Sequence, residues 1–232
     1  MTARTLYDLA GADAARRFSP YCWRAKLALG HKGLPFDTVP WRFTEKDAIA
    51  MSGQGRVPVL VDGERVVHDS WRIACHLEEA HADRPSLFGG TAARDATRFL
   101  NQWTDGVLHL ALLPILMGDL FGHVHEQDRD YFRATREERF GRKLEEIGHD
   151  REQAIATFQA TLAPLRATLE VQPFLGGDTP RYGDYIVLGA FLWARGVSPI
   201  KLLETDDPIA AWRDRVAATR SDVLADAVCY PW

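Results

Sequence analysis

The amino-acid sequence predicts an α/β domain followed by an all-α domain. The first 90 or so residues alternate strand-like and helix-like segments in the order β-α-β-(α)-β-β-α, which is typical of a mixed sheet with helices packed on it. Residues 92–228 contain no convincing strand pattern and several stretches with apolar residues at helical spacing. We therefore predict domains over residues 1–85 and 92–232, with a linker over residues 82–92.

Composition and charge narrow the possible functions. The chain has 232 residues, of which 46% are apolar and 26% charged, as in ordinary globular proteins. The net charge of -4 at pH 7 lacks the basic excess of nucleic-acid-binding domains. No stretch approaches 18 consecutive apolar residues, and the first residues lack an apolar signal region. We therefore expect neither a membrane span nor export.

The cysteines and histidines favour neither a disulfide framework nor a metal centre. Cys22, Cys75 and Cys229 are an odd and sparse set, which suits a reducing compartment, and we expect a cytoplasmic protein. His123 and His125 are two residues apart, but no further spaced ligands accompany them. We therefore predict no metal site.

The first strand and helix are expected around a Ser-Pro pair. Leu6–Leu9 is a short strand candidate. Ser19 is a typical N-cap residue, and Pro20 suits the first helical position, where its missing N–H costs nothing. The helix should end near Lys32, because Gly33 provides a C′ stop.

A second strand and a hairpin should complete the sheet. Phe36–Val39 predicts the second strand, and the polar, glycine-bearing residues 41–56 predict a loop that could hold one short helix. Val57–Val61 and Glu64–Val67 predict a hairpin, because the intervening Asp62-Gly63 supplies the positive φ angles of a tight turn.

Helices follow the hairpin to the end of the chain. Asp69 and Ser70 should begin one helix, and residues 92–120 should form a long helix that Pro114 kinks. Further on, Asp184 is a plausible N-cap for a buried helix. Residues 127–144 are highly charged and should be exposed. Residues 152–169 should form an amphipathic helix.

Four motifs together point to a known family. They are Ser19-Pro20-Tyr21-Cys22-Trp23-Arg24 at a strand-to-helix turn, Gly55-Arg56-Val57-Pro58-Val59, Asp69-Ser70-Trp71, and Gln127-Asp128-Arg129-Asp130-Tyr131. With them the chain resembles the soluble glutathione transferases over essentially its whole length, and most closely the branch that contains bacterial β-aryl-etherases of lignin breakdown. The resemblance implies a thioredoxin-like first domain, an all-helical second domain, glutathione as co-substrate and a homodimer.

Ser19 is the candidate catalytic residue. The thiol of glutathione must ionise to attack an electrophile, and a helix N-terminus with a hydroxyl donor stabilises a thiolate. Lowering the thiol pKa by about two units requires roughly 2.7 kcal/mol, which one charge-assisted hydrogen bond and the helix end can supply. The alternative is that Ser19 only caps the helix.

Cys22 is the rival nucleophile, since a cysteine in the first turn of a helix can have a low pKa. The stretch resembles the Cys-x-x-Cys of glutaredoxins with serine in place of the first, attacking cysteine. That replacement argues against dithiol chemistry and favours a packing role for Cys22.

The resemblance also places the other parts of glutathione. It implies a cis Pro58, with Val57 pairing with the cysteinyl backbone like an added strand. It implies that Asp69 binds the γ-glutamyl ammonium and that Ser70 binds the γ-glutamyl carboxylate. The alternatives are a trans proline in an edge strand and a simple helix cap at Asp69-Ser70.

Two parts of the site remain open at this stage. The glycyl carboxylate needs a cation or another donor, for which the loop before Pro58 offers four candidates: Arg56, Gln54, Lys46 and Arg42. The electrophile pocket of the family faces the glutathione sulfur from the first long helix of the second domain. Some of Trp103, Met117 and Phe121 could line it, although most of this apolar stripe should be core.

Two classes of function follow. The first is an enzyme that directs the glutathione thiolate at an apolar, aromatic electrophile; in an etherase the thiolate would displace an aryloxide at an ether carbon. The second is a non-catalytic carrier of hydrophobic ligands or an interaction protein on the same fold. The presence of Ser19, Pro58, Asp69 and Ser70 favours the enzyme.

Overall fold

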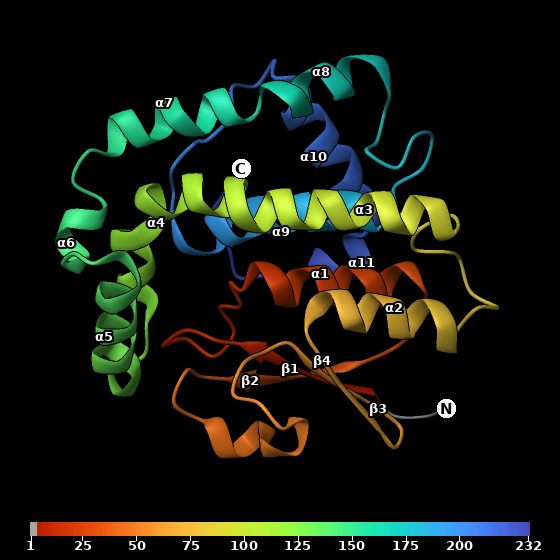
Figure 1. Ribbon diagram of the computed structural model, residues 1–232, viewed down its shortest axis with the longest axis horizontal. Coiled ribbons are helices and arrows are strands. Elements are labelled where there is room, and N and C mark those ends of the chain that lie inside the picture. The colour runs from red at the N-terminus through yellow and green to blue at the C-terminus, as the bar shows by residue number, and fades with distance from the viewer. Residues whose placement is uncertain (1–3) are drawn as a thin grey trace.

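The computed structural model describes residues 4–232, and its first part is a four-stranded sheet covered by two helices (Figure 1). The strand order is β2-β1-β3-β4, in which β1 and β2 are parallel and the other pairs antiparallel. The strands are β1 (Arg4–Leu9), β2 (Asp37–Trp41), β3 (Val59–Asp62) and β4 (Arg65–His68). Helices α1 (Pro20–His31) and α2 (Ser70–Ala80) pack against each other on one face of the sheet. The predicted mixed α/β domain is confirmed.

The loop between β2 and β3 holds the short 3-10 helix η1 (Lys46–Ser52), as the sequence allows. Strand β2 runs two residues further than expected, through Pro40 to Trp41. Proline is tolerated there because β2 is an edge strand, where a missing ladder donor faces no neighbour. In the hairpin, Asp62 pairs with Arg65 inside the ladder, and only Gly63 has a positive φ. The expected contribution of Asp62 to the turn was therefore wrong.

The second part is all-helical, as predicted. Its centre is a continuous helix formed by α3 (Thr91–Trp103), the π turn η2 (Thr104–Leu108) and α4 (His109–His123). The irregularity of this helix is the π turn, which precedes Pro114; Pro114 itself lies inside α4. By length and composition alone this helix could cross a membrane; in the fold it packs against α7 and α9.

Shorter helices surround this long helix. They are η3 (Glu126–Asp128), α5 (Arg129–Phe140), α6 (Leu144–Ile147), α7 (Arg151–Thr161), α8 (Ala163–Val171), α9 (Tyr182–Val197), α10 (Pro208–Thr219) and α11 (Ser221–Leu224). The charged segment expected to be exposed is mainly α5, and the amphipathic segment is divided into α7 and α8 ahead of Pro164. Figure 1 shows α5 and α6 extending along one end of the molecule.

Helix α9 joins the two domains, because its buried length packs against α1. Two glycines permit the close approach: a Cβ at Gly189 would lie 2.7 Å from the carbonyl oxygen of Pro20, and one at Gly196 would lie 3.1 Å from the Cβ of Phe18. The expectation that Asp184 is the N-cap of α9 was wrong, because Arg181 holds that position and Asp184 lies three residues later. Asp184 still serves the helix start, since its carboxylate accepts the N–H of Arg181 at 2.8 Å.

Candidate active site

Ser19 occupies the N-cap of α1, as predicted. Its Oγ accepts the backbone N–H of Cys22 at 3.3 Å, and Pro20 follows at the first helical position. The side chain lies against the buried end of the helix, with 4% of the residue exposed. Because the oxygen is the acceptor in the cap, the hydroxyl proton is left for another partner. The serine can thus cap the helix and donate a hydrogen bond at the same time.

Cys22 is fully buried, and burial raises the pKa of its thiol strongly. A nearby Asp8 carboxylate acts in the same direction, while a hydrogen bond from Ser19 opposes both. A buried thiol held in its neutral form is inert as a nucleophile. The structure therefore supports the packing role of Cys22. The neutral Cys22 sulfur is only a weak acceptor for the Ser19 hydroxyl, so a bound thiolate can replace it as the acceptor.

Pro58 and Asp69 lie directly opposite each other at the start of the hairpin. The peptide bond between Val57 and Pro58 is cis, as the resemblance implies. The register pairs Val59 with His68, and one step further the carbonyl oxygen of Pro58 accepts the N–H of Asp69 at 3.3 Å. Folding of β3 against β4 thus brings two predicted anchors, 11 positions apart in the sequence, into contact.

Asp69 begins α2 with an unusual backbone. Its φ is +72°, and its Oδ1 accepts the N–H groups of Trp71 and Arg72 at 3.1 and 3.0 Å. The residue is exposed, and its Oδ2 accepts no hydrogen bond from the rest of the described chain. Asp69 is therefore a helix cap, as the alternative proposed, with one carboxylate oxygen still available to a cation. Ser70 is 2% exposed, and its carbonyl oxygen accepts the hydroxyl of Tyr182 at 2.7 Å.

The four candidates for binding the glycyl carboxylate differ in the hydrogen bonds and ion pairs that they already make. Gln54 donates to Ser52 Oγ and to the carbonyl oxygen of Arg56, and accepts the N–H of Arg56, so it holds the loop. Arg42 pairs with Glu45 at 3.5 Å.

The other two candidates are Lys46 and Arg56. Lys46 donates to the carbonyl oxygen of Gly55 at 2.8 Å and to the Tyr131 hydroxyl at 3.3 Å. Arg56 is exposed, and its guanidinium contacts no carboxylate among residues 4–232. Arg56 is thus the most available of the three candidate cations for a carboxylate ligand.

Tyr21 is a neighbour of the site that sequence reasoning missed. Its ring meets the edge of His109 at a centroid distance of 5.4 Å, and the Arg24 guanidinium lies 4.9 Å from its centroid. Burial is the main cause that raises the pKa of Tyr21, and the Asp105 carboxylate raises it too. The charge of Arg139 lowers this pKa, and that of Asp69 raises it. The first turn of α1 therefore lies within electrostatic reach of both α2 and α5.

A buried arginine attaches α1 to the long helix. Arg24 is fully buried, and its guanidinium donates to Asp105 at 2.8 Å and to Asn101 at 3.3 Å. His109 lies 3.5 Å from it, and burial together with the Arg24 charge lowers the pKa of His109 well below its ordinary value. This network attaches α1 to the long helix where α3 passes through η2 into α4. Its signal in the sequence is the unusual arginine among the apolar residues of α1.

The three apolar candidates for the electrophile pocket differ in burial. Met117 is 1% exposed and belongs to the core, as most of the stripe was expected to. Trp103 and Phe121 are partly buried, and Phe121 packs 6.0 Å from Phe132 of α5.

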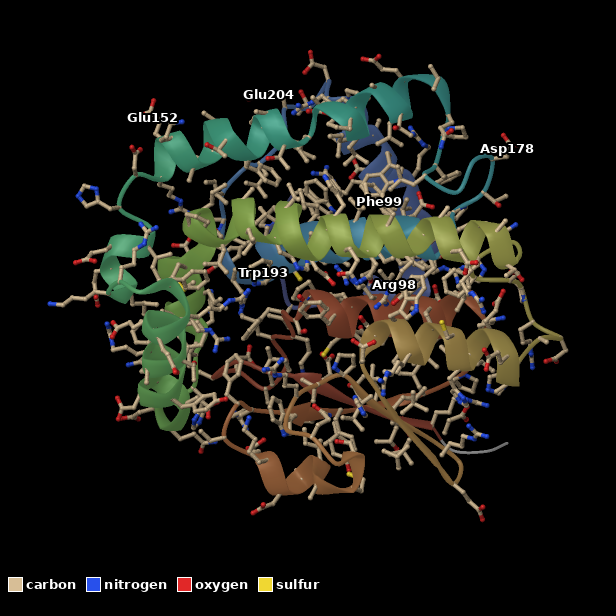
Figure 2. The ribbon with its side chains drawn as sticks, viewed as in Figure 1. Arg98, Phe99, Glu152, Asp178, Trp193 and Glu204 are labelled. Carbon is tan, nitrogen blue, oxygen red and sulfur yellow. The ribbon has the colours of Figure 1, made fainter. Side chains whose placement is uncertain are left out.

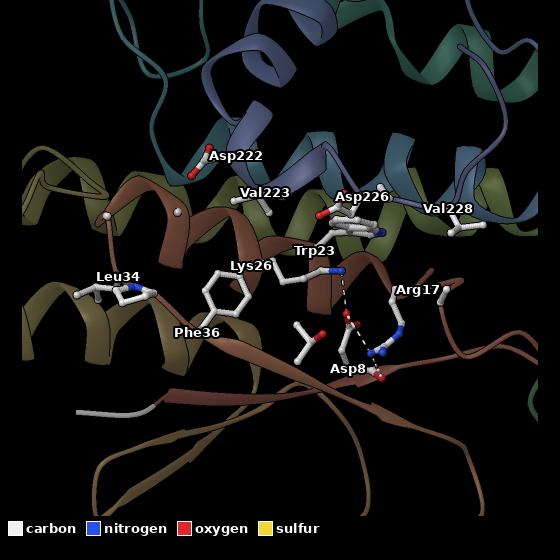
Figure 3. A pocket seen from close by; sticks show the side chains of 16 residues that line it. Asp8, Arg17, Trp23, Lys26, Leu34, Phe36, Asp222, Val223, Asp226 and Val228 are labelled. Carbon is white, nitrogen blue, oxygen red and sulfur yellow. Dashed lines mark hydrogen bonds and ion pairs between the residues drawn. The ribbon is translucent and has the colours of Figure 1, made fainter. Parts of the chain in front are cut away.

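A cavity of about 630 Å³ lies away from these residues, between α1, the sheet and the C-terminal segment (Figure 3). Asp8, Lys26 and Arg17 form an ion-paired group on its wall, with 2.8 Å between Lys26 Nζ and Asp8 Oδ2 and 3.8 Å between Arg17 Nη1 and the same oxygen. None of the predicted site residues lines it. Within the described part of the chain, no group of three or more His, Cys, Asp and Glu side chains could hold a metal ion.

Comparison with known families identifies the class of protein. The "Glutathione S-transferase, N-terminal domain" family matches residues 15–85, and the "Glutathione S-transferase, C-terminal domain" family matches residues 97–218. The second match alone spans more than half of the chain. The chain therefore belongs to the glutathione S-transferase family.

Individual relatives are distant. A "Probable glutathione S-transferase GSTU6" from Oryza sativa is 27% identical over 219 residues, covering 87% of this chain and 81% of the relative. The structure of glutathione transferase GSTFuA3 from Phanerochaete chrysosporium has a TM-score of 0.84 at 24% identity, over 94% of this chain and 97% of that chain. That of CsGST63524 from Ceriporiopsis subvermispora, in complex with glutathione, has a TM-score of 0.81 at 22% identity, over 95% and 97%. These structural similarities show the shared fold.

Proposed function

We propose that this protein is a glutathione transferase that binds reduced glutathione with its sulfur at Ser19. The observation that carries the proposal is the Ser19 hydroxyl at the N-terminus of α1: its oxygen accepts the cap hydrogen bond, and its proton faces only the weak acceptor Cys22 within the described chain. Helices α1 and α2 begin at the same end of the sheet (Figure 1). The complex of the Ceriporiopsis transferase with glutathione supports the same ligand here.

The anchors suit the three parts of the tripeptide. The free Oδ2 of Asp69 is an acceptor for the γ-glutamyl ammonium, and the start of α2 at Ser70 suits the γ-glutamyl carboxylate. The backbone of Val57, ahead of the cis Pro58, suits the cysteinyl backbone as an added strand. Arg56 is the cation for the glycyl carboxylate, while Gln54 supports it by holding its loop.

The enzyme would act by stabilising and aligning the thiolate. A hydrogen bond from Ser19 and the partial positive charge of the α1 N-terminus favour the ionised sulfur over the thiol. The sulfur would then attack an apolar, aromatic electrophile held against α4 and α5. For an aryl ether the S–C bond forms as the C–O bond breaks, and the aryloxide leaves with the electron pair. Ether cleavage and a cytoplasmic location are part of this proposal.

The homodimer is proposed from one exposed helical face. Phe99, Val107 and Leu110 are 75%, 44% and 44% exposed, and they follow one another at spacings of eight and three residues along the helix from α3 to α4. Figure 2 shows Phe99 on the side of α3 away from Arg98, which lies over Trp71 of α2. Burial of such a face is a common reason for association. A monomeric mass in light scattering would contradict this part.

The test is a titration of bound glutathione, with thiolate absorbance measured across pH for the wild type and Ser19→Ala. We expect the wild type to ionise glutathione about two pH units below the free thiol, and the variant to lose this shift. If both proteins lower the thiol pKa equally, Ser19 is only a cap. If neither protein binds glutathione, the enzyme proposal fails and the carrier of hydrophobic ligands takes its place.

A further inference from the structure

Among residues 4–232, Arg136 of α5 has no oppositely charged partner. Its guanidinium lies 4.2 Å from the ring centroid of Phe132 and 5.1 Å from that of Phe43, so it is stacked where α5 meets the end of β2. Its one hydrogen bond goes to the Thr135 hydroxyl at 2.9 Å. A guanidinium has five N–H donors, so most of its binding capacity is unused within the described chain.

The carboxylates that could neutralise Arg136 are occupied by other groups. Asp128, on the same helical face two turns earlier, accepts the N–H groups of Phe43 and Thr44, each at 3.0 Å. Glu45 pairs with Arg42. By contrast Arg133, one turn away on α5, pairs with two glutamates, Glu137 and Glu145. Within residues 4–232, Arg136 thus lacks the carboxylate partners that Arg133 on the same helix has.

The surroundings of Arg136 are positively charged. Burial lowers the pKa of its guanidinium; Tyr131 opposes this, while the charges of Arg139 and Arg56 lower the pKa further. Lys46, bound to the hydroxyl of Tyr131, is also in this region. In a chain with a net charge of -4, a cluster of cations without carboxylates favours an anionic ligand.

The cluster lies beside the proposed glutathione site. Arg56 belongs to the loop that precedes Pro58, and Arg139 lies close enough to Tyr21 to affect its pKa. Glutathione brings one carboxylate to this side, the glycyl group, for which Arg56 is available. Arg136 lies on α5 beside the paired rings of Phe43 and Phe132, so it remains for the second substrate.

We propose that the electrophile of this enzyme is an aromatic anion, such as an aryl carboxylate, whose negative group binds Arg136. The planar fork of the guanidinium matches a carboxylate with two parallel hydrogen bonds. The rings of Phe43 and Phe132 exclude water from one face of the pair, which strengthens it. The proposal rests on the glutathione transferase function and adds the charge of its substrate.

The test compares two electrophiles of nearly equal shape, 4-chloro-3-nitrobenzoate and 4-chloro-3-nitrobenzamide. In both, the thiolate sulfur bonds to the ring carbon, the C–Cl bond breaks, chloride leaves with the electron pair, and the thiol proton has gone to solvent. Arg136 takes no part in the proton transfer. Because the amide is intrinsically the more reactive, the measured quantity is the ratio of kcat/KM for acid over amide.

We expect Arg136→Met to lower this ratio about 10- to 100-fold, through a higher KM for the acid, which corresponds to a charged hydrogen-bonded pair. Arg133→Met is the matched control, since Arg133 is stacked on Phe121 of the same region but has its own carboxylates; it should leave the ratio unchanged. Arg136→Lys keeps the charge without the fork and should fall between the wild type and Arg136→Met.

Three results would overturn the proposal. The ratio could be the same in Arg136→Met and the wild type, or Arg136→Met could raise the KM for glutathione equally with both electrophiles, which would assign Arg136 to the glycyl carboxylate. In both cases turnover of the amide would leave the transferase function standing. If the wild type turns over neither compound and binds no glutathione, the function and the inference both fail.

A measurement on the wild type makes the test independent of folding of the variants. The non-reacting pair 3-nitrobenzoate and 3-nitrobenzamide is used to inhibit turnover of a neutral electrophile. We expect the acid to compete with the electrophile but not with glutathione, and to bind at least about 10-fold more tightly than the amide. Equal inhibition by the two compounds would contradict an anion site.

Discussion

Helices α1 and α9 lie against each other, and each has a buried polar side chain in or just before its first turn, but the two starts are built differently. The Ser19 oxygen accepts one backbone N–H of its own helix, and its hydroxyl proton meets only the weak thiol acceptor of Cys22 within the described chain. Asp184 has no exposed surface and accepts four hydrogen bonds, from the N–H groups of Leu175, Gly176 and Arg181 and from the indole of Trp212.

The difference separates a structural helix start from a functional one. Burial raises the pKa of Asp184, while its four hydrogen bonds oppose that rise, so every acceptor position serves the fold. The hydroxyl of Ser19 is only partly used, so the end of α1 can accept a ligand that the end of α9 cannot. A partly used buried polar group at a helix N-terminus is thus a better sign of function than a fully used one.

The largest expected effect is on the α9 side. Asp184→Ala leaves three backbone N–H groups and the Trp212 indole without their acceptor in a buried place, and should cost roughly 3–5 kcal/mol of the free energy of unfolding. Urea denaturation measures it. Asp178→Ala, in the exposed turn ahead of α9, is the control and should change stability by less than about 0.5 kcal/mol. If Asp184→Ala lowered the free energy of unfolding by no more than this control, the four hydrogen bonds of Asp184 would not stabilise the start of α9.

The second effect is a pH dependence at the other end of α1. His31 donates to the carbonyl oxygen of Ser86 and accepts the hydroxyl of Tyr185 of α9, and burial lowers its pKa from 6.5 to about 4. The unfolded chain therefore binds more protons between these values, so stability is complete above pH 6.5 and declines toward pH 4.

We expect this decline to be about 2 kcal/mol from His31 alone, after allowance for partial exposure. Because burial also lowers the pKa of His109 and His123, the total decline is larger, and the measurement is the difference between the wild type and His31→Gln in urea denaturation at several pH values. The variant should lose part of the slope. Parallel curves for the two proteins would show that His31 does not titrate on unfolding.

A third effect concerns the contact between the two helices. Gly189→Ala places a Cβ 2.7 Å from the carbonyl oxygen of Pro20, and moving α1 away should cost about 1–2 kcal/mol. It should also raise the KM for glutathione, because Ser19 lies next to Pro20. Gly118→Ala, at a helical position with open space, is the control. Unchanged stability in Gly189→Ala would mean that the approach of α1 and α9 is loose.

The smallest expected change in stability is at Ser19 itself. Glycine is nearly as good an N-cap as serine, so Ser19→Gly should lower the free energy of unfolding by only a few tenths of a kcal/mol. The same variant lacks the hydroxyl donor, so glutathione turnover should fall about 100-fold. Thermal denaturation and initial rates separate the two roles. If activity survives in Ser19→Gly, the helix end alone activates the thiol.

Local sequence was sufficient for the elements that depend on neighbouring residues. Ser19-Pro20 at a helix start and Gly33 at its end are local rules of backbone geometry, and both hold. Periodicity separated the α/β part from the helical part for the same reason, since the spacing of buried residues follows from the element itself. The motifs around Pro58 and Asp69 indicated the family.

Tertiary structure decided the features in which the partners are far apart in the sequence. Asp184 was expected to cap a helix, but its four donors come from the loop before α9, the helix start and Trp212 of α10, and only the fold brings these together. The same holds for the hydrogen bond between Pro58 and Asp69 and for the ion pair between Arg24 and Asp105, which joins the two domains. Whether Arg136 has a carboxylate partner is likewise set by packing, because a single charge in a sequence does not show which opposite charge will lie beside it.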